Sequence, residues 1–334
     1  MRISILGAGT WGTALAALLT KNGNDVSLWS AIPEEIKEIK ERGEHRNLPG
    51  VPLPSWIHYT DDIRTAVEGR EMIIFVTPSE YIRATAALAA PLIDSGATVI
   101  TAAKGIESGT LFTMTEIIAD ELGKARPGES FNVAALSGPT HAEEVALGLP
   151  TSIVAASEDE DIAREIAGVF ANSCLRVYTN RDVRGVEICG ALKNIIALAA
   201  GMSRGMGFGD NAKAALITRG AQEIMRMGVA IGCDKGTFMG LAGIGDLIVT
   251  CTSVHSRNNR CGEMIGSGMS YSEAKERIGM VVEGYHALSA ALEMAKRYGV
   301  EMPLTEAVHA VINKGRPIYD VMRELMARDI KSEI

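Results

Sequence analysis

The N-terminus contains the feature that most constrains the fold, because a short apolar run at residues 3–6 leads directly into the glycine-rich sequence GAGTWG. This sequence fits GxGxxG, and the spacing of residues 11–22 predicts an amphipathic helix after it. Strand, glycine turn and helix in this order are typical of a dinucleotide-binding βαβ unit. There, Gly7 permits the tight turn, Gly9 lets the backbone approach a pyrophosphate, and Gly12 allows close packing of helix on strand.

The first half of the chain continues to alternate short apolar runs with helical stretches. Further strands are predicted at residues 25–29, 72–76, 98–101, 133–136, 152–156 and 175–178, and helices at residues 33–42 and 162–170. This alternation favours a parallel sheet with helices on both faces. After about Arg181 only helical spacing remains. We therefore expect an α/β protein with a Rossmann-like, doubly wound domain over residues 1–180 and an all-helical substrate-binding domain over residues 181–334.

Length and charge support this organisation and exclude several classes of partner. A chain of 334 residues predicts two domains at roughly 150 residues each. The net charge is −8 and no Lys/Arg block interrupts it, so nucleic acid is not an expected partner. No run approaches the roughly 18 uncharged apolar residues of a membrane helix, and the N-terminus lacks the pattern of a signal peptide. We therefore expect no integral membrane segment.

Cysteine and histidine usage narrows the chemistry further. The five cysteines are an odd number without a CxxC pair, which favours reduced thiols and a cytoplasmic location. The six histidines show no metal-ligand spacing, so no protein-held metal is expected. A GxSxG nucleophile elbow and a Walker loop are also absent from the sequence.

The end of the second predicted strand bears on the choice of cofactor. An acidic residue about 20 positions after the glycine loop usually holds the ribose of NAD, whereas an Arg accommodates the phosphate of NADP. Here the sequence is Leu-Trp-Ser-Ala-Ile, with Ala31 at the informative position. NAD and NADP both remain open, and the absence of a cation favours NAD.

Three charged side chains stand alone in long uncharged stretches: Lys104 in residues 95–106, Lys193 in residues 188–203 and Asp246 in residues 236–256. Taken singly, each lysine reads as a side chain whose stem covers apolar surface, and the aspartate as a cap. Taken together, they indicate proton-transfer chemistry, because a desolvated lysine gives up its proton more readily and a nearby carboxylate orients it.

The segment SRNNRCG, from Ser256 to Gly262, adds a possible anion site. It places two arginines with Ser and Asn before a predicted helical stretch at residues 263–265. Guanidinium and amide donors at a helix start suit a phosphate, although surface arginines in a polar loop are more often simply solvated.

In their order and spacing, the motifs of the chain resemble those of the bacterial NAD(P)-dependent glycerol-3-phosphate dehydrogenases along nearly the whole length. The motifs are GAGTWG, FVTPS from Phe75, AAKGIE from Ala102, LSGPTHAEEV from Leu136, VEICGALKN from Val186, NAKAALITRG from Asn211, GIGDLIVTCTS from Gly243, SRNNRCG from Ser256 and VVEG from Val281. The resemblance implies reversible reduction of dihydroxyacetone phosphate to sn-glycerol 3-phosphate, a product that feeds phospholipid synthesis. It also implies a homodimer, with the reacting groups meeting between the two domains.

The resemblance also implies roles for individual residues. Lys193 matches the catalytic lysine that protonates the ketone oxygen, Lys104 matches a position contacting both cofactor and substrate, and Asp246 matches the aspartate of the substrate site. Further substrate positions are Gly138, Thr140, Asn194, Thr250, Ser256, Arg257 and Asn258. Cofactor positions are Gly7, Gly9, Thr10, Trp11, Gly12, Ala31, Lys104, Ala142, Arg257, Val281 and Glu283.

The chain departs from the family pattern at two of these positions. Ala31 stands where many members carry Arg or His, and Thr140 stands where Ser is common. The alternative interpretations are a related 3-hydroxy acid dehydrogenase and a non-catalytic NAD-binding sensor. Lone charges at Lys104, Lys193 and Asp246 argue against the sensor, which needs no buried proton donor.

Overall fold

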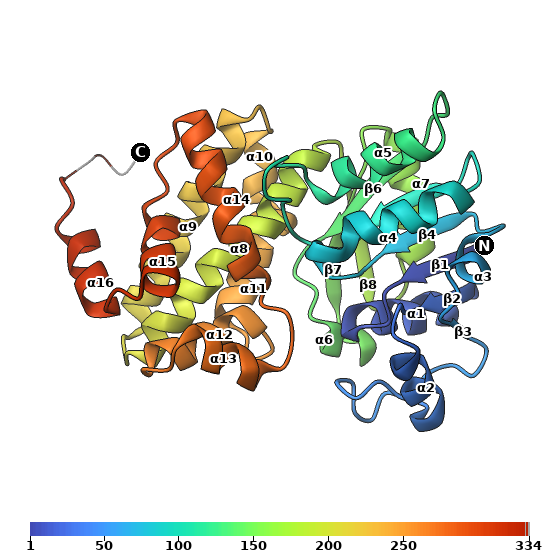
Figure 1. Cartoon of the computed structure of the whole chain (residues 1–334), viewed down its shortest axis with the longest axis horizontal. Coiled ribbons are helices and arrows are strands. Elements are labelled where there is room, and N and C mark those ends of the chain that lie inside the picture. The colour runs from blue at the N-terminus through green and yellow to red at the C-terminus, as the bar shows by residue number, and fades with distance from the viewer. Residues whose placement is uncertain (331, 333–334) are drawn as a thin grey trace. The chain divides into compact units, whose positions relative to one another are not determined.

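An eight-stranded sheet organises the N-terminal part of the protein, with neighbouring strands in the order β3-β2-β1-β4-β5-β6-β7-β8. The computed structural model describes residues 1–330 and 332 (Figure 1). The strands are β1 (Arg2–Leu6), β2 (Asp25–Trp29), β3 (His58–Thr60), β4 (Met72–Phe75), β5 (Thr98–Thr101), β6 (Asn132–Ser137), β7 (Thr151–Ala156) and β8 (Leu175–Asn180). The order reverses between β1 and β4, and ligands of such sheets bind at this switch point, beyond the carboxyl ends of the strands.

Helices cover both faces of the sheet, because successive side chains of a strand point to opposite faces. They are α1 (Thr10–Lys21), α2 (Pro33–Arg42), α3 (Ile63–Val67), η1 (Ser79–Tyr81), α4 (Ile82–Ala89), η2 (Ala90–Leu92), α5 (Met114–Ala125), α6 (Ala142–Ala146) and α7 (Glu160–Phe170). Ile3 and Ile5 share one apolar cluster with α1, α2 and α7, whereas Leu6 shares the other with α3, α4 and α5. The predicted doubly wound sheet is thus confirmed.

Two details of the sheet differ from the expectation. The edge strand β3 was not predicted, because His-Tyr-Thr is too short and too polar to stand out as a strand. Strand β7 pairs antiparallel with β6, whereas the other pairs are parallel. The connection between β6 and β7 contains only the five-residue helix α6, and parallel strands usually need a longer crossover helix.

The compact units of the fold do not coincide with the expected domain limits. One unit comprises residues 1–190 and 236–246, and the other comprises residues 191–235 and 247–334. The division falls inside α8 (Val183–Gly205), because the start of this helix packs on the sheet, where Val186 shares an apolar cluster with Ala135 and Val154. Residues 331, 333 and 334, at the end of the expected second domain, lie outside the described residues.

The second unit is helical, as predicted for the region after residue 181. Besides most of α8 it contains α9 (Asp210–Ala230), α11 (Asp246–Thr252) without its first residue, α12 (Arg257–Gly266), α13 (Tyr271–Ile278), α14 (Glu283–Tyr298), α15 (Pro303–Lys314) and α16 (Ile318–Met326). The short helices α10 (Lys235–Met239) and η3 (Leu241–Gly245) precede α11. By length and composition alone, α8 is the one helix among the described residues that meets the criteria for a membrane span, and 94% of its qualifying window is buried.

Helices α8 and α12 touch through their backbones. A Cβ atom placed on Gly201 would lie 2.0 Å from the carbonyl oxygen of Asn259, and one on Gly262 would lie 2.2 Å from that of Leu198. One turn further along, a Cβ atom on Gly266 would lie 2.2 Å from the carbonyl oxygen of Met202. Glycine is therefore required at these positions, and the register advances by four residues on both helices.

Two buried carboxylates each accept hydrogen bonds from the N-terminal end of a helix distant in sequence. Glu187 on α8 accepts hydrogen bonds from the backbone N–H and the hydroxyl of Thr115 at the start of α5. Glu223 on α9 accepts from the N–H groups of Leu304 and Thr305 and from the Thr305 hydroxyl at the start of α15. Burial raises the pKa of both, that of Glu187 to about 7, although the hydrogen bonds from the threonines oppose the shift.

The raised pKa of Glu187 predicts a pH-dependent stability. The folded state binds the proton more tightly than the unfolded state, so this stabilisation is complete below pH 4.5 and is lost as the pH rises through about 7. The loss amounts to about 3 kcal/mol at 1.36 kcal/mol per pKa unit. In urea titrations between pH 5 and 8, wild type should lose stability relative to Glu187→Gln as the pH rises. A difference that does not change with pH would contradict the assignment.

Candidate active site

The glycine loop lies at the switch point of the sheet, between the ends of β1 and β4. Gly7 has φ +128°, and a Cβ atom there would lie 2.8 Å from the backbone nitrogen of Thr77, just after β4. A Cβ atom on Gly12 would lie 1.9 Å from the Gly7 carbonyl oxygen, whereas one on Gly9 would meet no protein atom within 4 Å. Gly7 and Gly12 are therefore required by the protein itself, and Gly9 leaves space beside the loop.

The start of α1 fits the pyrophosphate of a dinucleotide. Gly9 is its N-cap and provides no capping side chain, and the first turn carries no acidic residue. Its N–H groups and the positive end of the helix dipole suit an anion. Thr10 and Trp11 form the first turn, and Ala142 at the start of α6 belongs to the same apolar cluster as Trp11. The residues present thus fit the cofactor.

Lys104 and Asp246 form a largely buried ion pair within the first unit. The Lys104 ammonium lies 2.7 Å from Asp246 Oδ2, and the Asp246 side chain is only 2% exposed. The ammonium also donates to the Gly138 carbonyl oxygen at 3.3 Å, which in turn accepts from the Thr140 hydroxyl at 3.2 Å. Four of the predicted site residues therefore meet at one place.

Local backbone geometry explains the glycines beside this ion pair. The turn η3, immediately before Asp246, is π-helical, a conformation that often marks functional sites. Its Gly243 is required, because a Cβ atom there would lie 2.2 Å from the Phe238 carbonyl oxygen. Gly138 has φ +152°, with Ile153 Cα only 3.2 Å from its Cβ position. The sequences GIGD and SGPT are thus the ones that this backbone tolerates.

Lys193 lies on α8 in the second unit and is 5% exposed. Its ammonium donates to the Thr250 hydroxyl at 2.7 Å. Thr250 is itself buried on α11, four residues after Asp246, so both residues share one face of that helix. Lys193 is thus held in a fixed direction by a neutral partner.

Beside Lys193, Asn194 leads to the predicted phosphate segment. The side-chain amide of Asn258 donates to Asn194 Oδ1 at 3.0 Å and accepts from the Gly284 N–H at 2.9 Å. Ser256 is the N-cap of α12 and accepts from the Asn259 N–H at 3.2 Å. The predicted motif therefore begins α12 rather than preceding it, with Arg257 half-buried in the first turn.

The remaining predicted residues take part less directly. Val281 and Glu283 are half-buried around the start of α14, next to the Gly284 that binds Asn258. Ala31 is exposed just beyond β2, so nothing about its surroundings distinguishes NAD from NADP.

Sequence reasoning missed two residues of these groups. Asn47 donates to the Thr10 hydroxyl at 3.2 Å, from a proline-rich loop that carries no motif. Asn259 is buried, and its amide donates to the Cys251 and Ala197 carbonyl oxygens, which joins α12 to α11 and α8. The repeated Asn in SRNN was a signal for Asn259, whereas nothing local pointed to Asn47.

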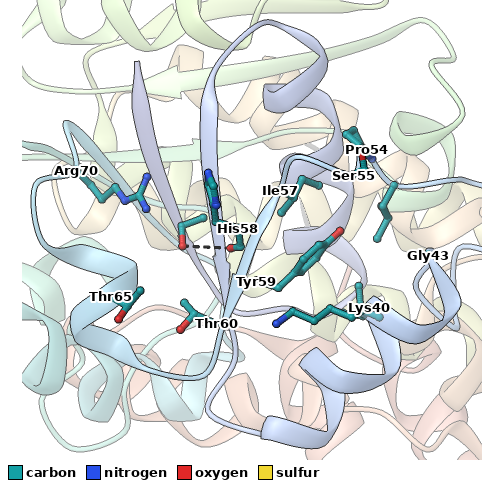
Figure 2. A pocket seen from close by; sticks show the side chains of 13 residues that line it. Lys40, Gly43, Pro54, Ser55, Ile57, His58, Tyr59, Thr60, Thr65 and Arg70 are labelled. Atoms are coloured by element: carbon teal, nitrogen blue, oxygen red, sulfur yellow. Dashed lines mark hydrogen bonds between the residues drawn. The ribbon is translucent and has the colours of Figure 1, made fainter.

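A cavity of about 730 Å³ lies apart from these residues, at the edge strand β3. Figure 2 shows Tyr59 beside Lys40 in this cavity, with Arg70 on the far side of His58. Arg70 and His58 both lie close to Asp25, which offsets the positive charge of Arg70. None of the predicted site residues lines this cavity, so volume alone does not locate the chemistry.

The structure also shows how the histidine, cysteine and acidic side chains are arranged. Within residues 1–330 and 332, no three His, Cys, Asp or Glu side chains gather in a way that could hold a metal ion. The five cysteines are thiols rather than disulfides, and burial raises the pKa of Cys261 to about 11, which makes it unreactive near neutral pH.

Comparison with known proteins matches this geometry to one family. The models for the N-terminus and C-terminus of NAD-dependent glycerol-3-phosphate dehydrogenase match residues 2–163 and 182–323. The chain is 50% identical to glycerol-3-phosphate dehydrogenase [NAD(P)+] 2 of Lactobacillus delbrueckii subsp. bulgaricus, over 100% of this chain and 99% of the relative. It is 47% identical to the glycerol-3-phosphate dehydrogenase [NAD(P)+] of Moorella thermoacetica, over 99% and 97% of the two chains.

A solved structure of the same family is also similar to this chain. The crystal structure of glycerol-3-phosphate dehydrogenase from Coxiella burnetii superposes with a TM-score of 0.93 and 37% identity, over 98% of this chain and 99% of that one. Both the sequence matches and the structural match extend over nearly the full length of each partner. The chain therefore belongs to the NAD-dependent glycerol-3-phosphate dehydrogenase family.

Proposed function

We propose that the protein reversibly reduces dihydroxyacetone phosphate to sn-glycerol 3-phosphate with NADH or NADPH. The observation that carries this proposal is Lys193, a buried lysine oriented by Thr250, in a chain whose full length matches enzymes named for this substrate. A buried ammonium oriented by a neutral hydroxyl group is suited to give a proton to a developing alkoxide and to take it back in the reverse direction.

Each side chain of the site has its own proposed role in the reaction. When bound, the reduced nicotinamide supplies the hydride to the ketone carbon. Lys193 donates its proton to the ketone oxygen, and the Thr250 hydroxyl fixes the direction of the ammonium. Lys104 polarises the carbonyl group, while Asp246 holds the Lys104 ammonium in place at 2.7 Å. The Gly138 carbonyl oxygen, which also accepts from the Thr140 hydroxyl, gives that ammonium a second acceptor.

Ser256, Arg257 and Asn258 are proposed to bind the substrate phosphate at the start of α12. Arg257→Ala should mainly raise the KM for dihydroxyacetone phosphate, by about 10- to 100-fold, the size expected for a lost hydrogen bond to a charged group of about 1.5–3 kcal/mol. Arg260→Ala is the matched control, because Arg260 is exposed on the same helix three residues later. Steady-state kinetics of both variants would make the comparison, and an unchanged KM in Arg257→Ala would contradict the phosphate assignment.

We further propose that NADH is preferred over NADPH, because Ala31 offers no cation to a 2′-phosphate. The kcat/KM should be higher with NADH in wild type. Ala31→Arg should raise the kcat/KM with NADPH by about tenfold or more, as one charge-assisted hydrogen bond allows. A strong NADPH preference in wild type would overturn this proposal.

The cellular setting is proposed on the same grounds. The five cysteine thiols support a cytoplasmic enzyme. The product is a precursor that acylation reactions of phospholipid synthesis consume, and a homodimer is the state that the family resemblance implies.

The deciding assay follows reduced-nicotinamide absorbance after adding dihydroxyacetone phosphate, with NADH and NADPH in parallel and unphosphorylated dihydroxyacetone as control. Oxidation with the phosphorylated ketone alone supports the proposal. Turnover of a 3-hydroxy acid instead would indicate the related dehydrogenase class. Binding of NADH without turnover of either substrate would indicate a sensor.

A further inference from the structure

Lys104 begins a segment, residues 104–113, whose two ends are joined by backbone contacts. Ile106 and Thr113 form an isolated antiparallel bridge, and the Glu107 N–H donates to the Phe112 carbonyl oxygen at 2.9 Å. Leu111 has φ +63°, a conformation that a leucine adopts only when the surrounding contacts impose it. The two ends of the segment, Lys104 near one and Thr113 at the other, are therefore tied together.

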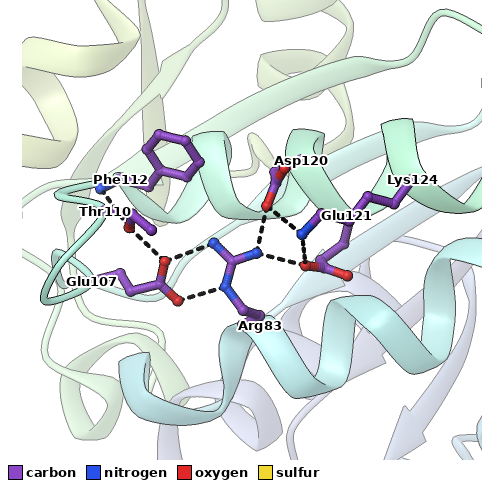
Figure 3. A network of polar contacts seen from close by, with 7 residues as sticks. All are labelled: Arg83, Glu107, Thr110, Phe112, Asp120, Glu121 and Lys124. Carbon is purple, nitrogen blue, oxygen red and sulfur yellow. Dashed lines mark hydrogen bonds and ion pairs between the residues drawn. The ribbon is translucent and has the colours of Figure 1, made fainter.

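An arginine fastens this segment to the helices beneath it. Figure 3 shows the Arg83 guanidinium between Glu107 on one side and Asp120 and Glu121 on the other. Both bonds from Arg83 to Glu107 measure 2.6 Å, which makes the pair bidentate. The segment also packs closely on Ser79 at Gly105, where a Cβ atom would lie 2.4 Å from the Cβ atom of Ser79.

Helix α8 contacts both this segment, at Lys104, and the start of α5, which follows the segment. Glu187 accepts from the N–H of Thr115 at 2.9 Å and from its hydroxyl, two residues past the Thr113 end. One turn later, Gly190 faces the stem of Lys104, since a Cβ atom on Gly190 would lie 3.3 Å from Lys104 Cγ. Residues three apart share one face of a helix, so Glu187 and Gly190 set the position of α8 on the segment.

We propose that Glu187 is a positioning residue that fixes the Lys104 ammonium through α5 and the segment 104–113. The carboxyl group of Glu187 fixes the start of α5 by accepting from Thr115. Because the segment 104–113 leads into α5 and its two ends are joined, this contact also limits the movement of Lys104. The Lys104 ammonium then remains hydrogen-bonded to Asp246 and to the Gly138 carbonyl oxygen. The consequence for catalysis rests on the proposed role of Lys104 in polarising the ketone. The position of the ammonium itself is independent of that role.

The protein supplies a matched control. Glu223 and Thr305 repeat the arrangement of Glu187 and Thr115, with a buried carboxylate that accepts from a threonine N–H and hydroxyl at a helix start. Neither Glu223 nor Thr305 is a site residue. Comparing Glu187→Ala with Glu223→Ala, and Thr115→Val with Thr305→Val, thus separates loss of position from general loss of a buried hydrogen bond.

The first readout does not depend on activity. The full-length protein is acetylated briefly with an N-hydroxysuccinimide ester, and the rate at Lys104 is measured by peptide mass spectrometry relative to the exposed Lys37. Thr115→Val and Glu187→Ala should acetylate Lys104 about three- to tenfold faster than wild type, as expected for a shift of one hydrogen bond. Thr305→Val and Glu223→Ala should stay within about twofold. Equal rates in Thr115→Val and Thr305→Val would overturn the proposal, even if Glu187→Ala fails to fold.

The second readout is a double-mutant cycle on ketone reduction. Thr115→Val should lower kcat/KM by about three- to tenfold in wild type but by less than about twofold in a Lys104→Ala background, because the residue acts through Lys104. Full additivity would overturn the link to catalysis. If wild type does not reduce dihydroxyacetone phosphate, the proposed function fails, while the acetylation rates still decide whether Glu187 positions Lys104.

Discussion

Lys193→Met should lower kcat for the reduction of dihydroxyacetone phosphate by about 10²- to 10⁴-fold, the usual contribution of a positioned general acid. Methionine keeps much of the stem volume but removes the ammonium, which is the proposed proton donor to the ketone oxygen. The dissociation constant for NADH, measured by fluorescence titration, should stay nearly unchanged, because the glycine loop that fits the cofactor lies in the other unit.

Lys213→Met is the control for this substitution. Lys213 lies on α9 in the same helical unit, partly exposed and paired with Asp210, and it has no proposed role in the reaction. Its kcat should remain close to that of wild type. A fall of only a few-fold in Lys193→Met would remove Lys193 from the role of proton donor.

Gly9→Ala should lower NADH affinity alone, whereas Gly12→Ala, three positions later, should lower both stability and NADH affinity. At Gly9 the new methyl group meets no protein atom and the backbone has φ −67°, so the free energy of unfolding should stay within about 0.5 kcal/mol. The same methyl group would occupy the space proposed for the pyrophosphate. Affinity for NADH should therefore fall by about tenfold or more, equivalent to about 1.4 kcal/mol.

At Gly12 the methyl group would lie 1.9 Å from a backbone oxygen, so α1 must move off the sheet. Overpacking of this kind costs about 1–3 kcal/mol and occasionally more, and stability should fall together with binding. Urea unfolding and NADH titration of both variants make the comparison. Unchanged NADH affinity in a stable Gly9→Ala protein would show that the dinucleotide does not approach the loop there.

The fold was predictable from sequence where local pattern decides it. The strands β1, β4 and β5 and the glycine turn can be predicted directly, because strands buried on both faces are rich in Ile, Val and Leu. The direction of β7 was not predictable, since its apolar pattern is the same in either orientation. Strand β3 owes its existence to pairing with β2 rather than to its own residues.

For the candidate site, the sequence predicts which residues take part but not which of them contact one another. Lys104, Lys193 and Asp246 stood out as lone charges, but the pairing of Lys104 with Asp246 spans 142 residues of sequence. No local rule predicts such a pair, nor the choice of Thr250 as partner of Lys193. Glu187 escaped notice because an acidic residue near the start of a helix is ordinary until its burial is known.

The backbone contact between α8 and α12 limits how this enzyme can be adapted to other substrates. Asn194 and Asn258 stand in the same register as Leu198 with Gly262 and Met202 with Gly266, each pair 64 positions apart. No side chain separates the two helices at these glycines, so substitutions there cannot narrow the spacing and can widen it only by breaking the contact. With the substrate phosphate bound at the start of α12, as proposed above, larger phosphorylated ketones would therefore have to be accommodated by shortening side chains on these helices, not by moving one helix away from the other.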